Sequence, residues 1–106
     1  MAPMIATVEE AQVFAKEARA AGFTRVGIMV EIPAITRVIP QLKGVVDFLS
    51  IGTNDLSQYL FAADRVNSAV AGLLNPWQPA LLSTLESIAT ESAAVGIKVG
   101  VCGEAA

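Results

Sequence analysis

Hydrophobic positions follow a helical period in two parts of the chain. Near the start, the stretch 7–10 (TVEE) fits a capping box with Thr7 as N-cap, and apolar residues follow at helical spacing. Gly22 is suited to end this first helix, and Gly96 to end the second. The second helix is predicted from an apolar stripe made of Leu81, Leu82, Leu85, Ile88 and Ala89.

Three short apolar runs have the length and composition of buried strands. They cover residues 26–30, 46–51 and 97–101, and helical segments separate them. Strands that alternate with helices predict βα units and a parallel sheet, whose strands are apolar on both faces. We therefore expect an α/β fold.

The segments between these strands carry helix-start and helix-end signals. Pro33 is expected to open a short helix, which Pro40 and Gly44 end or kink. A longer helical region is expected over roughly residues 56–74, with a break near Asp64.

The composition is unusually apolar for a short chain. The sequence has 106 residues, of which 54% are hydrophobic and 16% charged, and its mean hydropathy is +0.57. Small free-standing domains bury a smaller fraction of their surface than large ones, and about 25% of their residues are typically charged. We therefore expect one domain whose core continues elsewhere, either in a homodimer or higher oligomer or in a larger fold.

Charge and residue counts exclude several classes of function. A net charge of −3 and scattered lysines and arginines argue against a nucleic-acid partner. No apolar run reaches the roughly 18 residues of a membrane span, and the start lacks the basic region of a signal peptide. The one cysteine, Cys102, excludes an internal disulfide and suits the cytoplasm. The sequence contains no histidine.

Polar and reactive side chains follow the predicted strands directly. Glu31 comes after the first strand, Asn54 and Asp55 after the second, and Cys102 after the third. Because parallel strands end at the same edge of a sheet, these residues should lie together. That edge binds ligands in parallel barrels and in open α/β sheets, so the sequence indicates a site there.

Each of these residues has a functional and a structural interpretation. Glu31 and Asp55 could hold Mg²⁺, which needs one or two carboxylates plus substrate oxygens, or could be helix-start acids. Asn54 could donate to a phosphate or be a turn residue. Arg65 could clamp a phosphate or pair with the preceding aspartate at the surface. Cys102 could be an acid, a nucleophile or a small buried hydrophobe.

Together, four segments resemble a known family. The segments "PMIATVEE" (3–10), "GIMVEIPA" (27–34), "VDFLSIGTNDLSQYLFAADR" (46–65) and "VGVCGEAA" (99–106) resemble, in order, the PEP-binding barrel of the PEP-utilising enzymes. The resemblance implies that residues 1–106 are a fragment of a (β/α)8 TIM barrel, about strands 4–7. The residues of these segments are more similar to those of enzyme I of the bacterial PEP:sugar phosphotransferase system than to those of pyruvate phosphate dikinase or PEP synthase.

The resemblance also implies roles for the site residues. Glu31 and Asp55 would be the protein ligands of a catalytic Mg²⁺. Asn54, Asp55 and Arg65 would bind phosphoenolpyruvate, although Val66 stands where the family usually has glycine. Cys102 would protonate the methylene carbon of the enolate, which releases pyruvate.

The implied function is that of a PEP-protein phosphotransferase in sugar transport. Such an enzyme passes the phosphoryl group to its own histidine, outside this chain, and on to a histidine-containing phosphocarrier protein. Because a complete barrel takes about 250 residues, we expect this chain to be inactive alone. The alternatives are a fragment of a dikinase or synthase, a stand-alone half-barrel that oligomerises as a binding module, and an unrelated Mg²⁺-dependent lyase barrel.

Overall fold

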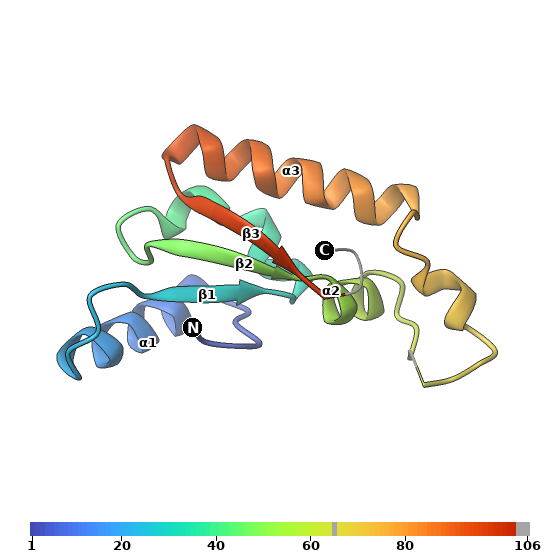
Figure 1. Ribbon diagram of the computed structural model, residues 1–106, viewed down its shortest axis with the longest axis horizontal. Helices are drawn as coiled ribbons and strands as arrows, with labels where there is room; N and C mark the ends of the chain where they lie inside the picture. The colour runs from blue at the N-terminus through green and yellow to red at the C-terminus, as the bar shows by residue number, and fades with distance from the viewer. Residues whose placement is uncertain (65, 104–106) are drawn as a thin grey trace.

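The computed structural model describes residues 1–64 and 66–103 and contains a parallel β-sheet flanked by helices (Figure 1). Helix α1 precedes strand β1, α2 follows β2 directly, and α3 leads into β3. Short 3-10 helices, η1 to η3, occupy the connections. The bounds are α1 Val8–Ala20, β1 Gly27–Val30, η1 Pro33–Arg37, η2 Ile39–Leu42, β2 Phe48–Gly52, α2 Thr53–Leu60, η3 Ala71–Leu74, α3 Pro79–Val95 and β3 Lys98–Cys102.

The described strands form one sheet in the order β1-β2-β3, and both pairings are parallel. In the register, Met29 lies opposite Ser50, which lies opposite Gly100. On the outer side of β1, Ala2 makes a parallel bridge to Ile28. The predicted α/β fold with a parallel sheet is therefore confirmed.

The two faces of the sheet differ in burial. Side chains alternate between faces along a strand, and Ile28, Val30, Leu49 and Ile51 point to the face that forms the core. There they pack with buried side chains of α1, η1, η2, α2 and α3. The intervening positions, such as Met29, Phe48 and Ser50, are only half-buried. The second face is consequently more open.

Helix α1 begins and ends where its sequence signals predict. Thr7 accepts the Glu10 N–H through its side chain, and the Glu10 carboxylate accepts the Thr7 N–H, so the capping box is complete. Gly22 follows the C-cap with a φ of +102°, a conformation in which L side chains are strained.

Helix α3 confirms the predicted boundaries but corrects the predicted stripe. It begins at Pro79 and ends at Val95, and its C-cap residue Gly96 has a left-handed backbone. Its fully buried positions are Leu81, Ile88 and Ser92, whereas Leu82 and Ala89 are exposed. Because α3 is apolar around much of its circumference, the hydrophobic pattern alone does not identify the face that packs on the sheet.

The connections differ from prediction in two places. Pro40 lies inside the second 3-10 helix, η2, and does not end a longer helix. The helical region expected over residues 56–74, with a break near Asp64, is helical only at its two ends among the described residues: α2 already begins at Thr53 and ends at Leu60, and η3 follows after a longer break than predicted. Ala62, with a φ of +49°, cannot continue a right-handed helix, which explains why α2 stops there.

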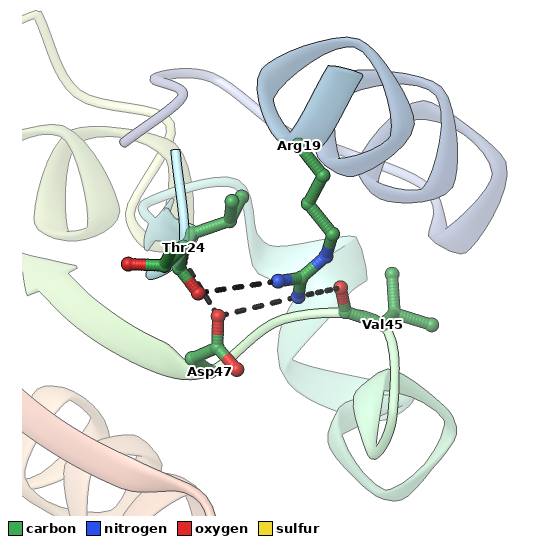
Figure 2. A network of polar contacts seen from close by, with 5 residues as sticks. Arg19, Thr24, Val45 and Asp47 are labelled. Carbon is green, nitrogen blue, oxygen red and sulfur yellow. Dashed lines mark hydrogen bonds and ion pairs between the residues drawn. The ribbon is translucent and has the colours of Figure 1, made fainter. Parts of the chain in front are cut away.

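A polar network ties the amino-terminal side of the sheet together (Figure 2). The Arg19 guanidinium donates to the carbonyls of Thr24 and Val45 and lies 3.2 Å from Asp47 Oδ2. The same Asp47 oxygen accepts the Val26 N–H at 2.8 Å. This N–H bond, followed by the Arg19 charge, lowers the pKa of Asp47. The network joins α1 to the chain just before β1 and β2.

In the described part of the chain, no helix has both the length and the apolar character needed to cross a membrane.

Candidate functional site

The sheet register brings three strand ends into one row. Gly52, the last residue of β2, pairs with Cys102, the last residue of β3. Val30 pairs with Ile51, so Glu31, the next residue along, lies beside Gly52. The carboxyl ends of the strands therefore place a carboxylate and a thiol on the same edge, as predicted.

Helix α2 adds further polar groups to this edge because it starts without an intervening loop. Thr53 is its first residue, and Asn54 and Asp55 occupy its first turn. Figure 1 shows α2 at the tips of the strand arrows. A glycine at the end of β2 followed at once by a helix thus places Asp55 close to Glu31.

Glu31 and Asp55 form a pair of neighbouring carboxyl groups. Glu31 is only 3% exposed, and its Oε2 accepts the Met4 N–H at 2.6 Å. Burial raises the pKa of Glu31, and the hydrogen bond and negative charge of Asp55 raise this pKa further, against the lowering effect of the Met4 N–H. A buried acid whose proton affinity depends on a second acid is an arrangement common at functional sites.

Gly52 makes room for the Glu31 carboxylate. A Cβ atom at Gly52 would lie 2.8 Å from Glu31 Oε1 and 3.1 Å from Met29 Cε. Real Cβ atoms essentially never show a contact as short as the one to Glu31 Oε1, so a side chain here would require the Glu31 carboxylate to shift. Glycine at the end of β2 therefore lets the Glu31 carboxylate occupy its observed position.

Cys102 is half-buried and held by a small set of hydrogen bonds. Its thiol donates to the Ile51 carbonyl at 3.3 Å, and the Ser50 hydroxyl donates to its sulfur at 3.5 Å. The Thr53 hydroxyl donates to the Cys102 carbonyl at 2.9 Å. Sequence reasoning missed Ser50 and Thr53. Their polarity could have identified them, because Ser50 is a polar residue inside an apolar strand and Thr53 directly follows that strand.

Asn54 lies against the chain that follows β3. A Cβ atom at Gly103 would lie 3.2 Å from Asn54 Oδ1, so these two residues are neighbours. The structure therefore brings four predicted residues to one edge of the sheet: Glu31, Asn54, Asp55 and Cys102. The fifth, Arg65, lies outside the described residues.

The acid pair fits a hard divalent cation. Over residues 1–64 and 66–103, no group of three or more histidine, cysteine or acidic side chains could hold a metal. Mg²⁺ does not require one, because it is commonly bound by one or two carboxylates and completes its shell with water and substrate oxygens. Glu31 and Asp55 supply such a pair, buried on one side.

Two hollows include residues at the starts of the strands, and the first of them extends to Ser50 in β2. One, of about 300 Å³, is lined by Arg25, Phe48 and Lys98 among others, and another, of about 460 Å³, lies by Phe14 and Phe23. Both include residues at or before the starts of strands. The candidate site is described by the side chains that converge at the carboxyl ends of the strands.

Comparison with known proteins gives consistent matches. A model of the PEP-binding domain of PEP-utilising enzymes matches residues 1–106. A phosphoenolpyruvate-protein phosphotransferase of Streptomyces coelicolor is 50% identical over 100% of this chain and 19% of its own length. One of Latilactobacillus sakei is 42% identical over 100% of the chain and 21% of its own length.

A protein of the phosphoenolpyruvate-dependent phosphotransferase system of Escherichia coli is 46% identical over 77% of the chain and 11% of its own length. The chain therefore spans about a fifth or less of the length of these curated relatives.

Proposed function

The chain belongs to the PEP-utilising enzyme family, matching its PEP-binding domain over residues 1–106, and from this premise we propose that it forms the metal-binding part of a PEP-protein phosphotransferase active site. The relatives named as phosphotransferases support this transferase class. The observation that carries the proposal is the meeting of Glu31, Asp55 and Cys102 at one edge of the sheet.

In this proposal Glu31 and Asp55 hold Mg²⁺ while phosphoenolpyruvate occupies the space beside them. Bound there, the ion would supply positive charge against the phosphoryl oxygens, the kind of electrostatic stabilisation on which phosphoryl transfer depends. Asn54 donates its side-chain amide to a substrate oxygen, and Asp55 also borders the substrate. Arg65 acts as a bidentate clamp on the phosphate.

Cys102 acts as the proton donor in this scheme. Loss of the phosphoryl group from phosphoenolpyruvate leaves the enolate of pyruvate. Its methylene carbon takes the proton of the Cys102 thiol, and the products are pyruvate and a thiolate. The Ser50 hydroxyl, which donates to the sulfur at 3.5 Å, would stabilise that thiolate, because a hydrogen bond to a charged form favours it.

The remaining parts of the reaction belong to chain outside this sequence. The phosphoryl group would pass to a histidine, and the sequence contains none. From there it would go to a histidine-containing phosphocarrier protein in the cytoplasm. We further propose that residues 1–106 correspond to about strands 4–7 of a TIM barrel, and that the chain alone does not turn over. Its edge strand β3, where Val101 is 45% exposed, favours self-association when alone.

Calorimetry with oxalate, an analogue of the pyruvate enolate, tests the proposal. We expect binding that requires Mg²⁺ and that weakens at least about tenfold in Asp55→Asn, which keeps the shape of the side chain but removes a charged ligand. Asp47→Asn is the matched control, since its carboxylate lies on the amino-terminal side of the sheet, and it should bind as the wild type does. Equal binding by Asp55→Asn, or no Mg²⁺-dependent binding by the folded chain, would overturn the proposed half-site.

A further inference from the structure

We propose that Thr53 is a positioning residue that holds Cys102 in place relative to the Glu31–Asp55 pair. The inference rests on the proposed function, because it assigns Thr53 a part in the same site. It extends that function by naming the contact that fixes the distance between the thiol and the metal-binding acids.

The first observation is a part-buried hydrogen bond between two elements of the site. Thr53 is 2% exposed, and its hydroxyl donates to the Cys102 carbonyl at 2.9 Å. Because Thr53 opens α2, the bond joins the helix that carries Asp55 to the last residue of β3. The Thr53 hydroxyl thereby connects α2, which carries Asp55, with β3, which carries Cys102.

The second observation is that, apart from its backbone pairing with β2, packing does little to fix the end of β3. It is an edge strand of the described sheet, and of its five residues three are exposed and none is fully buried. Packing alone therefore restrains this strand weakly, and edge positions open more readily than central ones. The bond from Thr53 acts where the restraint from packing is smallest.

The third observation concerns the chain just after Cys102. Gly103 has a φ of +100°, and a Cβ atom there would collide with the Thr53 hydroxyl oxygen. The backbone of Gly103 thus packs directly on this hydroxyl. A methyl group in place of the hydroxyl would both leave the Cys102 carbonyl without this donor and press against Gly103.

Among the described residues, the contacts to the sulfur itself are long and weak. The thiol donates to Ile51 at 3.3 Å and accepts from Ser50 at 3.5 Å, and bonds to sulfur are weaker than those to oxygen. The position of the sulfur consequently follows the position of the Cys102 backbone. Displacing that backbone would carry the thiol away from the acid pair.

Alkylation of Cys102 by iodoacetamide measures this positioning directly, because the sequence has one cysteine. The metal-free chain is compared with Thr53→Val, which loses the hydroxyl, and Thr53→Ser, which keeps it. We expect Thr53→Val to be alkylated about tenfold faster, the factor for one lost hydrogen bond of ordinary strength. Thr53→Ser should stay close to the wild-type rate.

Thr36→Val is the matched control. Thr36 is also buried, at 7% exposure, and its hydroxyl also donates to a backbone carbonyl, that of Pro33, at 2.6 Å. This variant loses the same kind of bond without touching Cys102, so its alkylation rate should match that of the wild type. An equal acceleration in Thr36→Val and Thr53→Val would overturn the proposal.

The dependence of the alkylation rate on low concentrations of urea distinguishes local opening around Cys102 from unfolding of the whole chain. Local opening exposes little surface, so its rate depends weakly on urea, whereas alkylation through global unfolding rises steeply. We expect the added rate in Thr53→Val to depend weakly on urea. A steep dependence, or a rate equal to wild type, would overturn the inference. Because these measurements contain no metal, a failure of Mg²⁺ binding would count against the proposed function alone.

Discussion

Replacement of Glu31 by glutamine is expected to stabilise the metal-free protein and to weaken Mg²⁺ binding. Glu31 is 3% exposed and faces the Asp55 carboxylate, so at neutral pH the fold holds two acids at close range. Glutamine keeps an oxygen that can accept the Met4 N–H, which now reaches Glu31 Oε2 at 2.6 Å. Its amide can donate to Asp55, which replaces repulsion by a hydrogen bond.

The magnitude follows from the two contacts that change. A hydrogen bond to a charged group contributes about 1.5–3 kcal/mol, and removal of a buried charge adds to it. The net gain is smaller than this sum, because burial and the neighbouring Asp55 raise the pKa of Glu31 and proton binding can relieve part of the repulsion in the wild type. We therefore expect a net gain of about 1–2 kcal/mol at pH 7, which corresponds to a rise in Tm of several degrees for a chain of this size.

The pH dependence provides the decisive assay. The folded state binds the Glu31 proton more tightly than the unfolded chain does, so wild-type stability falls as pH rises from the ordinary glutamate range through the raised pKa. Glutamine does not titrate. In thermal melts with EDTA, Glu31→Gln should match the wild type most closely below about pH 4 and exceed it increasingly toward pH 7. Glu86→Gln, at an exposed position on α3, serves as control.

Two results would refute this reasoning. A Glu31→Gln variant less stable than wild type at pH 7 would show that the two carboxyl groups do not oppose each other in the fold. A stability difference that stays constant with pH would show that Glu31 does not take up a proton as described. Titration with Mg²⁺ should reverse the order, since only the wild type keeps both carboxylates.

Three further predictions concern other parts of the structure. Asp47→Asn should lower Tm at neutral pH, and the difference should vanish as pH falls through the lowered pKa of Asp47, because protonation there removes the same stabilisation from the wild type. Gly96→Ala should cost about 1 kcal/mol in chemical denaturation, since Gly96 has a φ of +75° but open space around its Cα. Ser92→Ala should leave Tm unchanged or raise it slightly, because the fully buried Ser92 Oγ has no hydrogen-bond partner within the described residues.

The sequence predicted the sheet because its strands carry strong local signals. The three apolar runs and the turn residues between them are local signals, each contained in about ten consecutive residues. They are therefore sufficient to predict the strands and the order of the elements. The convergence of Glu31, Asp55 and Cys102 followed from topology, because parallel strands end at one edge. The start of α2 was missed because Thr53, Asn54 and Asp55 are poor helix formers, and tertiary contacts outweigh that local preference.

The supporting contacts of the site could not be predicted in this way. The bond from Thr53 to Cys102 spans 49 positions in the sequence, and that from Ser50 to Cys102 spans 52. Such contacts depend on which residues of β2 and β3 lie opposite each other. The hydrophobic pattern indicates which face of a strand is buried, but it does not determine this pairing. The roles proposed for the site residues, including Arg65, stay predictions from resemblance.

The sheet order equals the sequence order, which has a consequence for how the site assembles during synthesis. Each strand can dock on one that has already left the ribosome, so the sheet can grow in one direction without waiting for a later strand to insert. Glu31 and Asp55 meet once β1, β2 and α2 are in place, whereas Cys102 arrives with β3. A nascent chain would therefore bring the two acids together before the Cys102 thiol reaches them.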